Sequence, residues 1–580
     1  MTTYGSILQR GSYWMVTPAP EAMIRLKRVF AGVDKGAADQ VKLKRSPAVD
    51  MDLQWFMERY PFEIDPADAR EMHRGAEEYR AQQRVVDGLL NGPTPTHKYD
   101  LTVTPYDYQV VADRVWAAVY GLLLADDTGL GKTVTALLGL LDPSKHPAVV
   151  VCPKSVLPQW QGVIEVMAPS LRVHMLKGST PYRVDPTAQV LLVNYDRLST
   201  NEAEAPVAGW AGSMAGRVRS VVFDEIQALR HTGTARYKAA KYLADACKYR
   251  LGLSATPIHN YGGEFWSVCD VLRPNELGTW DEFRREECLE EGDGDKKSDG
   301  KETKRRGHVK LRNPEAFGRR LRDRGIMLRR TRGDVGKELP PVTVIPTYVD
   351  TGEDILAAMR GQAEEWARII VAEDKRSDAG VRKMQAAKKL SSLLRLSTGV
   401  AKAPNIAEIL RTLVESGERL LVGAWHIAVH DIFAETLSDY APAFYVGERD
   451  GRAMTDKQRA DSLRRFTKQE TPLLFMSLRS APGIDGLQHC CRNVFHAELD
   501  YTAVIHDQFR DRVDRPGQLE RVMEYFALSR RGSDPLVQNI LGEKRLQSSW
   551  VLDLKADTAA NGAILSSGRR MAEMVLGRAA

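Results

Sequence analysis

Cysteine is scarce in this sequence, and the spacings typical of metal-binding cysteines are missing. The 580 residues include six cysteines, and none of them forms a C-x-x-C pair. This pattern argues against a structural zinc site and against a disulfide framework, and it favours a reducing compartment. The cysteines are Cys152, Cys247, Cys269, Cys288, Cys490 and Cys491.

Long apolar runs and a strong charge imbalance are also absent. The longest uncharged apolar run, residues 116–125, is too short to cross a bilayer. The start of the chain, MTTYGSILQRGSYW, lacks the apolar core of a signal peptide. The 82 basic residues are set against 76 acidic ones, for a formal charge of +6. This balance permits nucleic acid as a partner without arguing for it. We expect a cytoplasmic protein with no membrane partner.

Two blocks of the chain repeat one pattern, in which short apolar runs alternate with helical stretches. Continuous apolar strands separated by helices indicate parallel sheets that are covered on both faces. Because the chain is too long for one hydrophobic core, the pattern predicts the α/β class, with two doubly wound parallel-sheet lobes in tandem. The predicted strands are 121–125, 148–152, 190–194, 220–224 and 250–254 in the first block, and 419–424, 472–477, 493–497 and 522–527 in the second.

Changes in composition indicate where the remaining domains begin and end. Residues 284–310 are nearly all charge and glycine, which predicts a mobile surface insertion. Near the N-terminus, residues 11–18 and 40–45 suggest strands and 52–60 a helix. The expected domains are a small α+β N-terminal domain (1–95), a first lobe (96–275), a charged insertion, arginine-rich junction and helical segment (276–400), a second lobe (401–545) and a C-terminal tail (546–580).

The stretch LLLADDTGLGKT, residues 122–133, has the form of a phosphate-binding loop between a strand and a helix. Gly129 and Gly131 would let backbone N–H groups wrap phosphates at the helix N-terminus. Lys132 would reach the β and γ phosphates, and Thr133 would ligate magnesium. The alternative is a glycine turn that caps a helix. The predicted nucleotide-binding residues are Asp126, Asp127, Thr128, Gly129, Leu130, Gly131, Lys132 and Thr133.

Two further strand ends carry residues suited to this chemistry. Asp224, at the end of a predicted neighbouring strand, can hold magnesium, and Glu225 can polarise an attacking water. Capping the next helix is the ordinary role of such an acidic pair. Ser254 and Thr256 stand at the end of the strand 250–254 and can sense the phosphate site. Together with Lys132, these residues predict hydrolysis of ATP with Mg²⁺ as cofactor.

These three elements, in this order, resemble the superfamily-two helicases and more closely their Swi/Snf-type branch, over roughly residues 100–530. The resemblance implies two RecA-like lobes. TPYDYQ (104–109) resembles the adenine-reading motif, which implies Gln109 as the base contact. Residues 149–160, with Lys154, and residues 190–198 resemble motifs that touch the nucleic-acid backbone.

The resemblance extends to the second lobe. HDQFRDRVDRPGQ (506–518) resembles the branch's arginine motif, which implies Arg512 and Arg515 as catalytic fingers and Gln518 as a coupling residue. A guanidinium from a second domain can neutralise charge developing on the γ-phosphoryl group. The alternative is that Arg512 and Arg515 form surface ion pairs with Asp511 and Asp514.

Three motifs depart from the family pattern. The acidic motif is DEIQ, so Gln227 takes the place of a histidine as the expected link to the other lobe. Asp514 stands where the arginine motif usually has histidine. In PGIDGLQ (482–488) the glycine-rich motif is rearranged, and no residue there is assigned a role.

The segment MLRRTRGDVGKELPP (327–341) is similar to the one that ends the first lobe of Swi/Snf-type motors. Its arginines Arg329, Arg330 and Arg332 are predicted to contact DNA phosphates, independently of sequence. The alternative is a solvated helix face.

Residues 497–518 resemble the annealing-helicase, or HARP-like, members, and the compact chain fits a bacterial or phage member. Those motors follow a small substrate-recognition domain, a part that residues 1–95 would play here. In that domain Trp14, Trp55 and Phe56 are expected in the core, with stacking on exposed bases as the alternative.

The sequence thus predicts an ATP-dependent translocase on double-stranded DNA, with annealing or remodelling of forks as a narrower form of that activity. Two rivals stay open. One is a strand-separating DNA or RNA helicase, and the other is an ATP-switched DNA-binding interaction protein.

Overall fold

The structure is a computed structural model. It describes residues 3–30, 33, 36–199, 209–258, 263–289, 309–336, 339–358, 360–371, 379–478, 484–538, 541 and 576. The chain forms two compact units that divide between Thr331 and Arg332. None of the helices in these ranges is long and apolar enough to cross a membrane.

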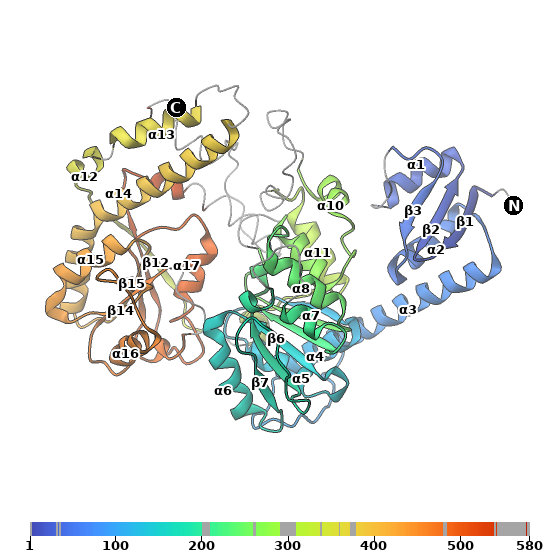
Figure 1. The fold of residues 1–580 in the computed structure, drawn as a ribbon, viewed down its shortest axis with the longest axis horizontal. Helices are drawn as coiled ribbons and strands as arrows, with labels where there is room; N and C mark the ends of the chain where they lie inside the picture. The colour runs from blue at the N-terminus through green and yellow to red at the C-terminus, as the bar shows by residue number, and fades with distance from the viewer. Residues whose placement is uncertain are drawn as a thin grey trace. The chain divides into compact units, whose positions relative to one another are not determined.

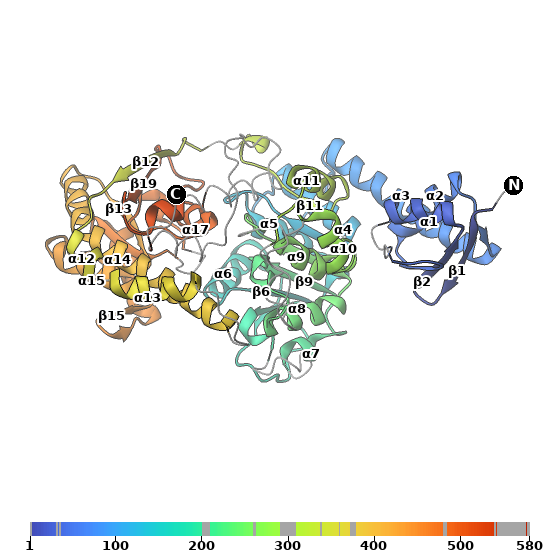
Figure 2. The ribbon, with the colours of Figure 1, turned by 90° about the horizontal axis from the view of Figure 1, so that it is seen from above.

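The first unit begins with a four-stranded sheet in the order β3-β2-β1-β4. Its antiparallel strands bury every second side chain against the helices on one side (Figures 1 and 2). The elements are β1 (Gly5–Arg10), β2 (Tyr13–Pro18), α1 (Pro20–Val29), β3 (Val41–Lys44), α2 (Pro47–Arg59), β4 (Glu63–Ile64) and α3 (Pro66–Asn91).

The aromatic residues of this domain divide between core and surface. Trp14 and Phe56 are buried, as expected, and Trp14 Nε1 donates a hydrogen bond of 2.6 Å to Asp50 Oδ1. Trp55 is 58% exposed, so its predicted place in the core is wrong. Consecutive helical residues point in different directions, and α2 buries Phe56 rather than its neighbour Trp55.

The next sheet has seven parallel strands in the order β11-β5-β10-β9-β6-β8-β7. Its strands are β5 (Gly121–Leu124), β6 (Ala148–Cys152), β7 (Val173–Met175), β8 (Val190–Asn194), β9 (Ser220–Asp224), β10 (Tyr249–Leu253) and β11 (Met327–Leu328). Its helices are α4 (Asp107–Val119), α5 (Lys132–Leu140), α6 (Leu157–Met167), α7 (Trp210–Met214), α8 (Ala235–Asp245), α9 (Glu264–Leu272), α10 (Trp280–Glu287) and α11 (Pro314–Asp323).

Both faces of this sheet are buried. Leu123, Val151 and Phe223 belong to one hydrophobic cluster, and their strand neighbours Leu124 and Val150 belong to another. Because alternate residues of a strand point to opposite faces, helices must cover the sheet on both sides. This is why the central strands read as unbroken apolar runs.

The second unit contains a six-stranded parallel sheet in the order β12-β19-β18-β13-β17-β14. Its strands are β12 (Thr343–Tyr348), β13 (Leu420–Ala424), β14 (Ala443–Tyr445), β17 (Leu473–Ser477), β18 (Asn493–His496) and β19 (Met523–Leu528), with the hairpin β15 (Glu448–Arg449) and β16 (Arg452–Ala453). Its helices are α12 (Glu353–Ala358), α13 (Arg360–Val371), α14 (Ala379–Glu415), α15 (Ile427–Thr436), α16 (Asp456–Thr467) and α17 (Ala503–Arg510).

The two parallel sheets confirm the predicted α/β class with two doubly wound lobes and a small α+β domain at the N-terminus. Residues 276–400, which the sequence assigns to neither lobe, divide between the sheets: β11 joins the first and β12 the second. Most of the charged insertion 284–310, residues 479–483 of the second-lobe motif and the tail 546–580, except residue 576, lie outside the described residues.

Candidate active site

Four segments that contribute to the candidate site lie at the ends of four adjacent strands of the seven-stranded sheet. The sequence predicted three of these segments, and the one after β11 was not expected. The strands β11, β5, β10 and β9 lie side by side and run parallel. Their carboxyl ends therefore share one edge, where open α/β sheets bind ligands. Asp224 is the last residue of β9, and β10 separates β9 from β5, so the prediction that its strand neighbours the strand of the loop is wrong. The convergence of the motifs is nevertheless preserved.

The predicted phosphate-binding loop, here residues 125–131, joins β5 to the N-terminus of α5. Gly129 and Gly131 have φ angles of 85° and 73°, a region that side chains strongly disfavour. A Cβ at Gly131 would also lie 2.6 Å from Gln109 Nε2. Thr133 is the second residue of α5 and is partly buried. The loop has the backbone geometry of an anion site at a helix N-terminus.

Lys132 is folded back on to this loop. Its Nζ donates to the carbonyl oxygens of Asp126 at 2.7 Å and Asp127 at 3.0 Å. Burial lowers the pKa of the ammonium, and the nearby carboxylates of Asp126 and Glu225 partly offset this. Phosphate oxygens would replace the two carbonyls as stronger, charged acceptors.

Gln109 lies against the loop but uses its amide on protein atoms. Its Oε1 accepts from Tyr106 N at 3.0 Å, and its Nε2 donates to Leu130 O at 3.1 Å. The side chain is 2% exposed. In this structure Gln109 ties α4 to the phosphate loop, and its role as a base contact stays a prediction.

Asp224 is held by two aromatic residues that sequence reasoning missed. Trp160 Nε1 donates to Asp224 Oδ2 at 2.7 Å, and the Tyr195 hydroxyl donates to the Asp224 carbonyl at 2.8 Å. Both come from segments predicted to touch the nucleic-acid backbone. Burial, followed by repulsion from Glu225, raises the pKa of the Asp224 carboxyl. The sequence could have indicated these two residues through their positions after β6 and β8, because the carboxyl ends of those strands lie at the same edge of the sheet as the end of β9.

Glu225 has a left-handed backbone, with φ 53° and ψ 51°. Such a conformation costs about 1–3 kcal/mol for a residue with a side chain, and it clusters at functional sites. The carboxylate accepts a short hydrogen bond from Gln227 Nε2. Gln227 is buried, and its Oε1 has no hydrogen-bond partner in the described part of the chain. A buried acceptor of this kind suits a residue that receives a donor from elsewhere.

The residues after β10 form a compact turn. Ser254 is 1% exposed, and its hydroxyl accepts a hydrogen bond of 3.0 Å from Thr256 N. This turn lies between the segments that follow β5 and β9. The place of Ser254 and Thr256 is suitable for a relay, and their coupling role stays a prediction.

The residues at this edge fit a magnesium ion. Asp224 and Thr133 offer the hard oxygen ligands that Mg²⁺ prefers, and the ion usually takes its remaining ligands from water and phosphate. The Asp224–Glu225 pair is an acidic pair whose mutual repulsion a divalent cation would relieve. Among the described residues no group of three or more His, Cys, Asp or Glu side chains could hold a metal by itself.

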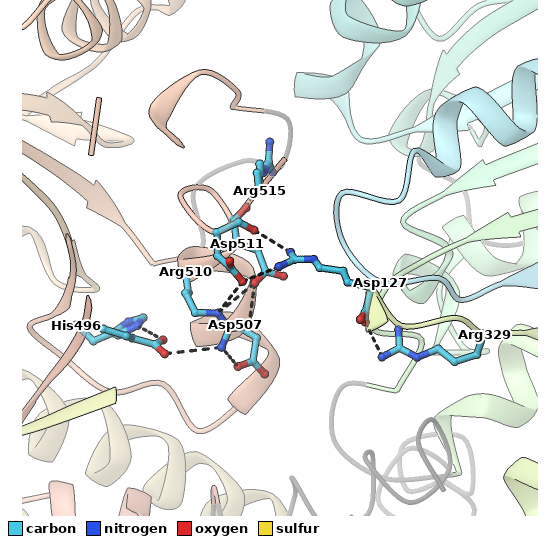
Figure 3. A network of polar contacts seen from close by, with 10 residues as sticks. Asp127, Arg329, His496, Asp507, Arg510, Asp511 and Arg515 are labelled. Atoms are coloured by element: carbon cyan, nitrogen blue, oxygen red, sulfur yellow. Dashed lines mark hydrogen bonds and ion pairs between the residues drawn. The ribbon is translucent and has the colours of Figure 1, made fainter. Parts of the chain in front are cut away.

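Arg329 and Arg330 lie at the phosphate loop, where their predicted role as DNA contacts finds no support. Arg330 forms a two-pronged ion pair with the fully buried carboxylate of Asp126. Arg329 forms an ion pair of 2.7 Å with Asp127 (Figure 3). The segment reaches the loop because β11 pairs with β5, a strand that sequence reasoning missed. Lys154 is exposed, and its predicted DNA contact is untested.

In the second unit, Arg510 organises the arginine motif. Its guanidinium lies 3.1 Å from Asp507 Oδ1, 2.8 Å from Asp511 Oδ1 and 3.7 Å from Glu524 Oε2 (Figure 3). Burial would lower the pKa of Arg510, but these acids outweigh burial and raise it. Asp511, which the sequence analysis considered as an ion-pair partner of Arg512 or Arg515, therefore forms its ion pair with Arg510.

The two predicted fingers follow Arg510 on the chain. Arg512 is 4% exposed. Arg515 Nη1 donates to the Ile484 carbonyl at 2.8 Å, and its Nε donates to the Asp511 carbonyl at 2.5 Å. Gln518 is buried, and its Nε2 donates to Cys491 O at 2.9 Å. Two backbone carbonyls, together with the carboxylate of Asp485 at 3.7 Å from Nη1, therefore orient Arg515.

Comparisons with known proteins agree with these motifs. An uncharacterized ATP-dependent helicase of Mycoplasma pneumoniae is 25% identical over 446 residues, which cover 73% of this chain and 40% of that protein. The DNA annealing helicase and endonuclease ZRANB3 of Bos taurus is 23% identical, with 73% of this chain and 38% of that protein covered. The aligned region thus spans about two fifths of these relatives.

A solved structure titled Sulfolobus solfataricus SWI2/SNF2 ATPase core in complex with dsDNA is 20% identical. The match covers 82% of this chain and 98% of that chain, with a TM-score of 0.35. A family model described as SNF2-related domain matches residues 51–355, slightly more than half of the chain. The chain therefore belongs to the family of proteins with an SNF2-related domain, the Swi/Snf-type branch that its motifs resemble.

Proposed function

We propose that this chain is an ATP-dependent motor that tracks along double-stranded DNA. The observation that carries the proposal is the convergence of Lys132, Asp224 and Glu225 at one edge of the seven-stranded sheet. The names of its relatives, ATP-dependent helicase and DNA annealing helicase, support the same activity.

In this proposal each residue has a separate task. The loop N–H groups and Lys132 bind the β and γ phosphates, and Glu225 orients and deprotonates the attacking water. Thr133 and Asp224 would hold Mg²⁺, which supplies positive charge to the phosphate oxygens when it is bound. Arg512 and Arg515 neutralise charge that develops on the γ-phosphoryl group. Gln227, Ser254, Thr256 and Gln518 couple this chemistry to movement on DNA.

Duplex DNA is expected to stimulate ATP hydrolysis severalfold, and single-stranded DNA of the same length and sequence much less. A motor that grips phosphates should also lose apparent DNA affinity steeply as salt rises, because binding releases counterions. The measurement is steady-state phosphate release with duplex, forked and single-stranded DNA at two salt concentrations. Lys132→Ala protein provides the background rate. Stimulation by single strands alone would favour the strand-separating helicase, and one ATP hydrolysed without turnover would favour the ATP-switched binder.

We further propose that residues 1–95 recognise the DNA substrate. The sheet face opposite α1–α3 (Figure 2) carries two cross-strand rows of exposed or partly exposed side chains. The rows are Arg10, Tyr13 and Lys44, and beside them Leu8, Met15 and Lys42. Three cations around an aromatic ring suit phosphates and exposed bases. Forked DNA, which offers both, is the proposed ligand of this face.

The double substitution Lys42→Glu with Lys44→Glu tests this face. We expect the slope of log affinity for forked DNA against log salt to fall by about 2, because each lysine neutralises one phosphate. Fluorescence anisotropy with forked and plain duplex DNA measures this effect. The matched control is Arg25→Glu with Arg28→Glu on α1, which changes the net charge equally on the helical side. Equal losses in both double variants would argue against a site on the sheet face.

A further inference from the structure

We infer that Arg329, Arg330 and Arg332 form a clasp that couples the phosphate loop to the arginine motif. The inference rests on the proposed function and assigns these residues a positioning role in it. The clasp consists of two contacts with the loop in the first unit and one contact with Asp514 in the second. Two peptide steps of chain separate Arg330 from Arg332.

The first contact is between Arg330 and Asp126. Arg330 Nε donates to Asp126 Oδ1 at 3.0 Å, Nη2 donates to Asp126 Oδ2, and the backbone N–H donates to Oδ1 at 3.1 Å. The Asp126 carboxylate is 0% exposed. The ion pair with Arg330 offsets the free-energy cost of burying its negative charge. The guanidinium also donates to the Tyr108 carbonyl and lies 5.1 Å from the centre of the Tyr108 ring. Arg330 therefore joins the loop to the segment that contains Gln109.

The second contact is between Arg329 and the other side of the same loop. Arg329 Nη1 donates to the Ala125 carbonyl at 2.7 Å and lies 3.4 Å from the Ala255 carbonyl. Nη2 forms the ion pair with Asp127. Ala255 stands between Ser254 and Thr256, so Arg329 contacts both the loop and the turn predicted to sense phosphate.

The third contact lies wholly within the second unit. Arg332 Nη1 lies 2.9 Å from Asp514 Oδ2, and Nη2 donates to the Asp514 carbonyl at 2.8 Å. Asp514 immediately precedes Arg515 and stands where the family usually has histidine. One of these contacts is an ion pair with the carboxylate, which a neutral histidine would not form, and the other is to the backbone carbonyl, which any residue offers. The aspartate that replaces the usual histidine at position 514 thus has Arg332 as its ion-pair partner.

These contacts give the loop a short mechanical connection to Asp514. Phosphates entering the loop compete for Lys132, which the Asp126 and Asp127 carbonyls hold. A shift of Asp126 or Asp127 would misalign these ion pairs unless Arg330 and Arg329 follow, because the planar guanidinium requires a fixed geometry of its partner. Adjacent Cα atoms are about 3.8 Å apart, so the two peptide steps from Arg330 to Arg332 span at most about 7 Å. We infer that the orientation of Arg515 depends on the occupancy of the loop through this connection.

Hydrogen exchange of residues 507–518 tests the clasp without requiring hydrolysis. In the full-length protein a non-hydrolysable ATP analogue is expected to slow exchange in this segment by about 5- to 150-fold, the usual range of allosteric coupling. In Arg332→Gln protein the analogue should still bind, since the loop contacts remain, but the change at 507–518 should disappear. Arg332→Lys should restore part of it. Arg464→Gln is the matched control, because that arginine forms surface pairs with Asp461 and Glu470.

Steady-state kinetics provide a second test. Asp126→Asn and Arg332→Gln should each lower the DNA-stimulated kcat by about tenfold to a hundredfold, since small misplacements of catalytic groups carry costs of this size. The double variant should be no slower than the slower single variant, because both interrupt one connection.

The possible results of these two experiments lead to different conclusions. Slowed exchange that persists in Arg332→Gln protein would overturn the clasp, because the arginine motif would then respond to nucleotide directly. Kinetic losses that multiply in the double variant would overturn it as well. Failure of the wild-type protein to bind the analogue would overturn the proposed function, and the clasp with it.

Discussion

Replacing Arg515 with glutamine is expected to lower DNA-stimulated kcat by about 10³- to 10⁵-fold, the range found for arginine fingers in phosphoryl transfer. The structure predicts that the variant is destabilised but still folds, because the glutamine amide can still donate a hydrogen bond and the side chain of Arg515 is partly exposed. Arg515 donates to two backbone carbonyls, and hydrogen bonds from a charged group contribute about 1.5–3 kcal/mol each. The Arg510 ion pairs that hold α17 and the following turn stay in place. Loss of turnover should therefore occur in a folded protein.

The measurement is a single-turnover assay with ATP in the presence of duplex DNA. Nucleotide and DNA affinity, measured in parallel, should stay within about twofold of wild type, because a group that acts only in the transition state does not change ground-state binding. Arg464→Gln serves as the matched substitution on the surface of the same unit. If Arg515→Gln protein retained half of its turnover, Arg515 would have no role in the chemistry, and Arg512 alone would remain as a candidate.

Replacing Glu225 with glutamine is expected to lower kcat by about 10²- to 10⁴-fold, the contribution typical of a general base. The change keeps the size of the side chain and an oxygen that can accept from Gln227 Nε2. The strained backbone of residue 225 is also unaffected, because glutamine and glutamate tolerate φ 53° equally poorly. The substitution therefore removes the negative charge and the ability to take a proton while keeping the shape of the side chain.

Lys132→Ala separates this effect from a loss of binding. Lys132 is expected to contact phosphates before and during the reaction, so its removal should raise the KM for ATP as well as lower kcat. Glu225→Gln should lower kcat with an unchanged or lower KM. The assay is phosphate release across a range of ATP concentrations, with DNA binding measured separately. Full turnover by Glu225→Gln protein would show that another residue is the base.

The sequence predicted the central strands well because burial on both faces leaves a clear pattern. All nine predicted strands of the two lobes are present, within one or two residues at their ends. Within the described residues of the two parallel sheets, the strands it missed are β7, β11, β12 and β14, which are the edge strands, and it also missed the short hairpin β15–β16. Edge strands are short or alternate in burial, as β12 does, and β12 even contains Pro346, which an edge tolerates. They lack the continuous apolar run on which the prediction depended.

The contacts that Arg329 and Arg330 make at the candidate site were also missed from the sequence, because they depend on an edge strand, β11. Local patterns pointed to Lys132, Asp224 and Glu225 because each follows a recognisable strand. No local pattern could pair Asp126 with Arg330, since the two are 204 residues apart and meet only because β11 adds to the edge of the sheet. For the same reason no local pattern shows that Trp160 and Tyr195, which lie in segments predicted to touch the nucleic-acid backbone, both donate to Asp224.

The late position of β11 has a consequence for synthesis of the chain. A nascent chain that has emerged only as far as α11 can already pair β5, β10 and β9, but its Asp126 carboxylate has no arginine partner. Contacts of high sequence separation form last when a chain folds from its N-terminus. The loop therefore gains its contacts with Arg329 and Arg330 only when residues 327–330 leave the ribosome, just before the second unit begins. A polypeptide truncated ahead of Arg329 would retain the loop but leave the buried carboxylate of Asp126 without its arginine partner.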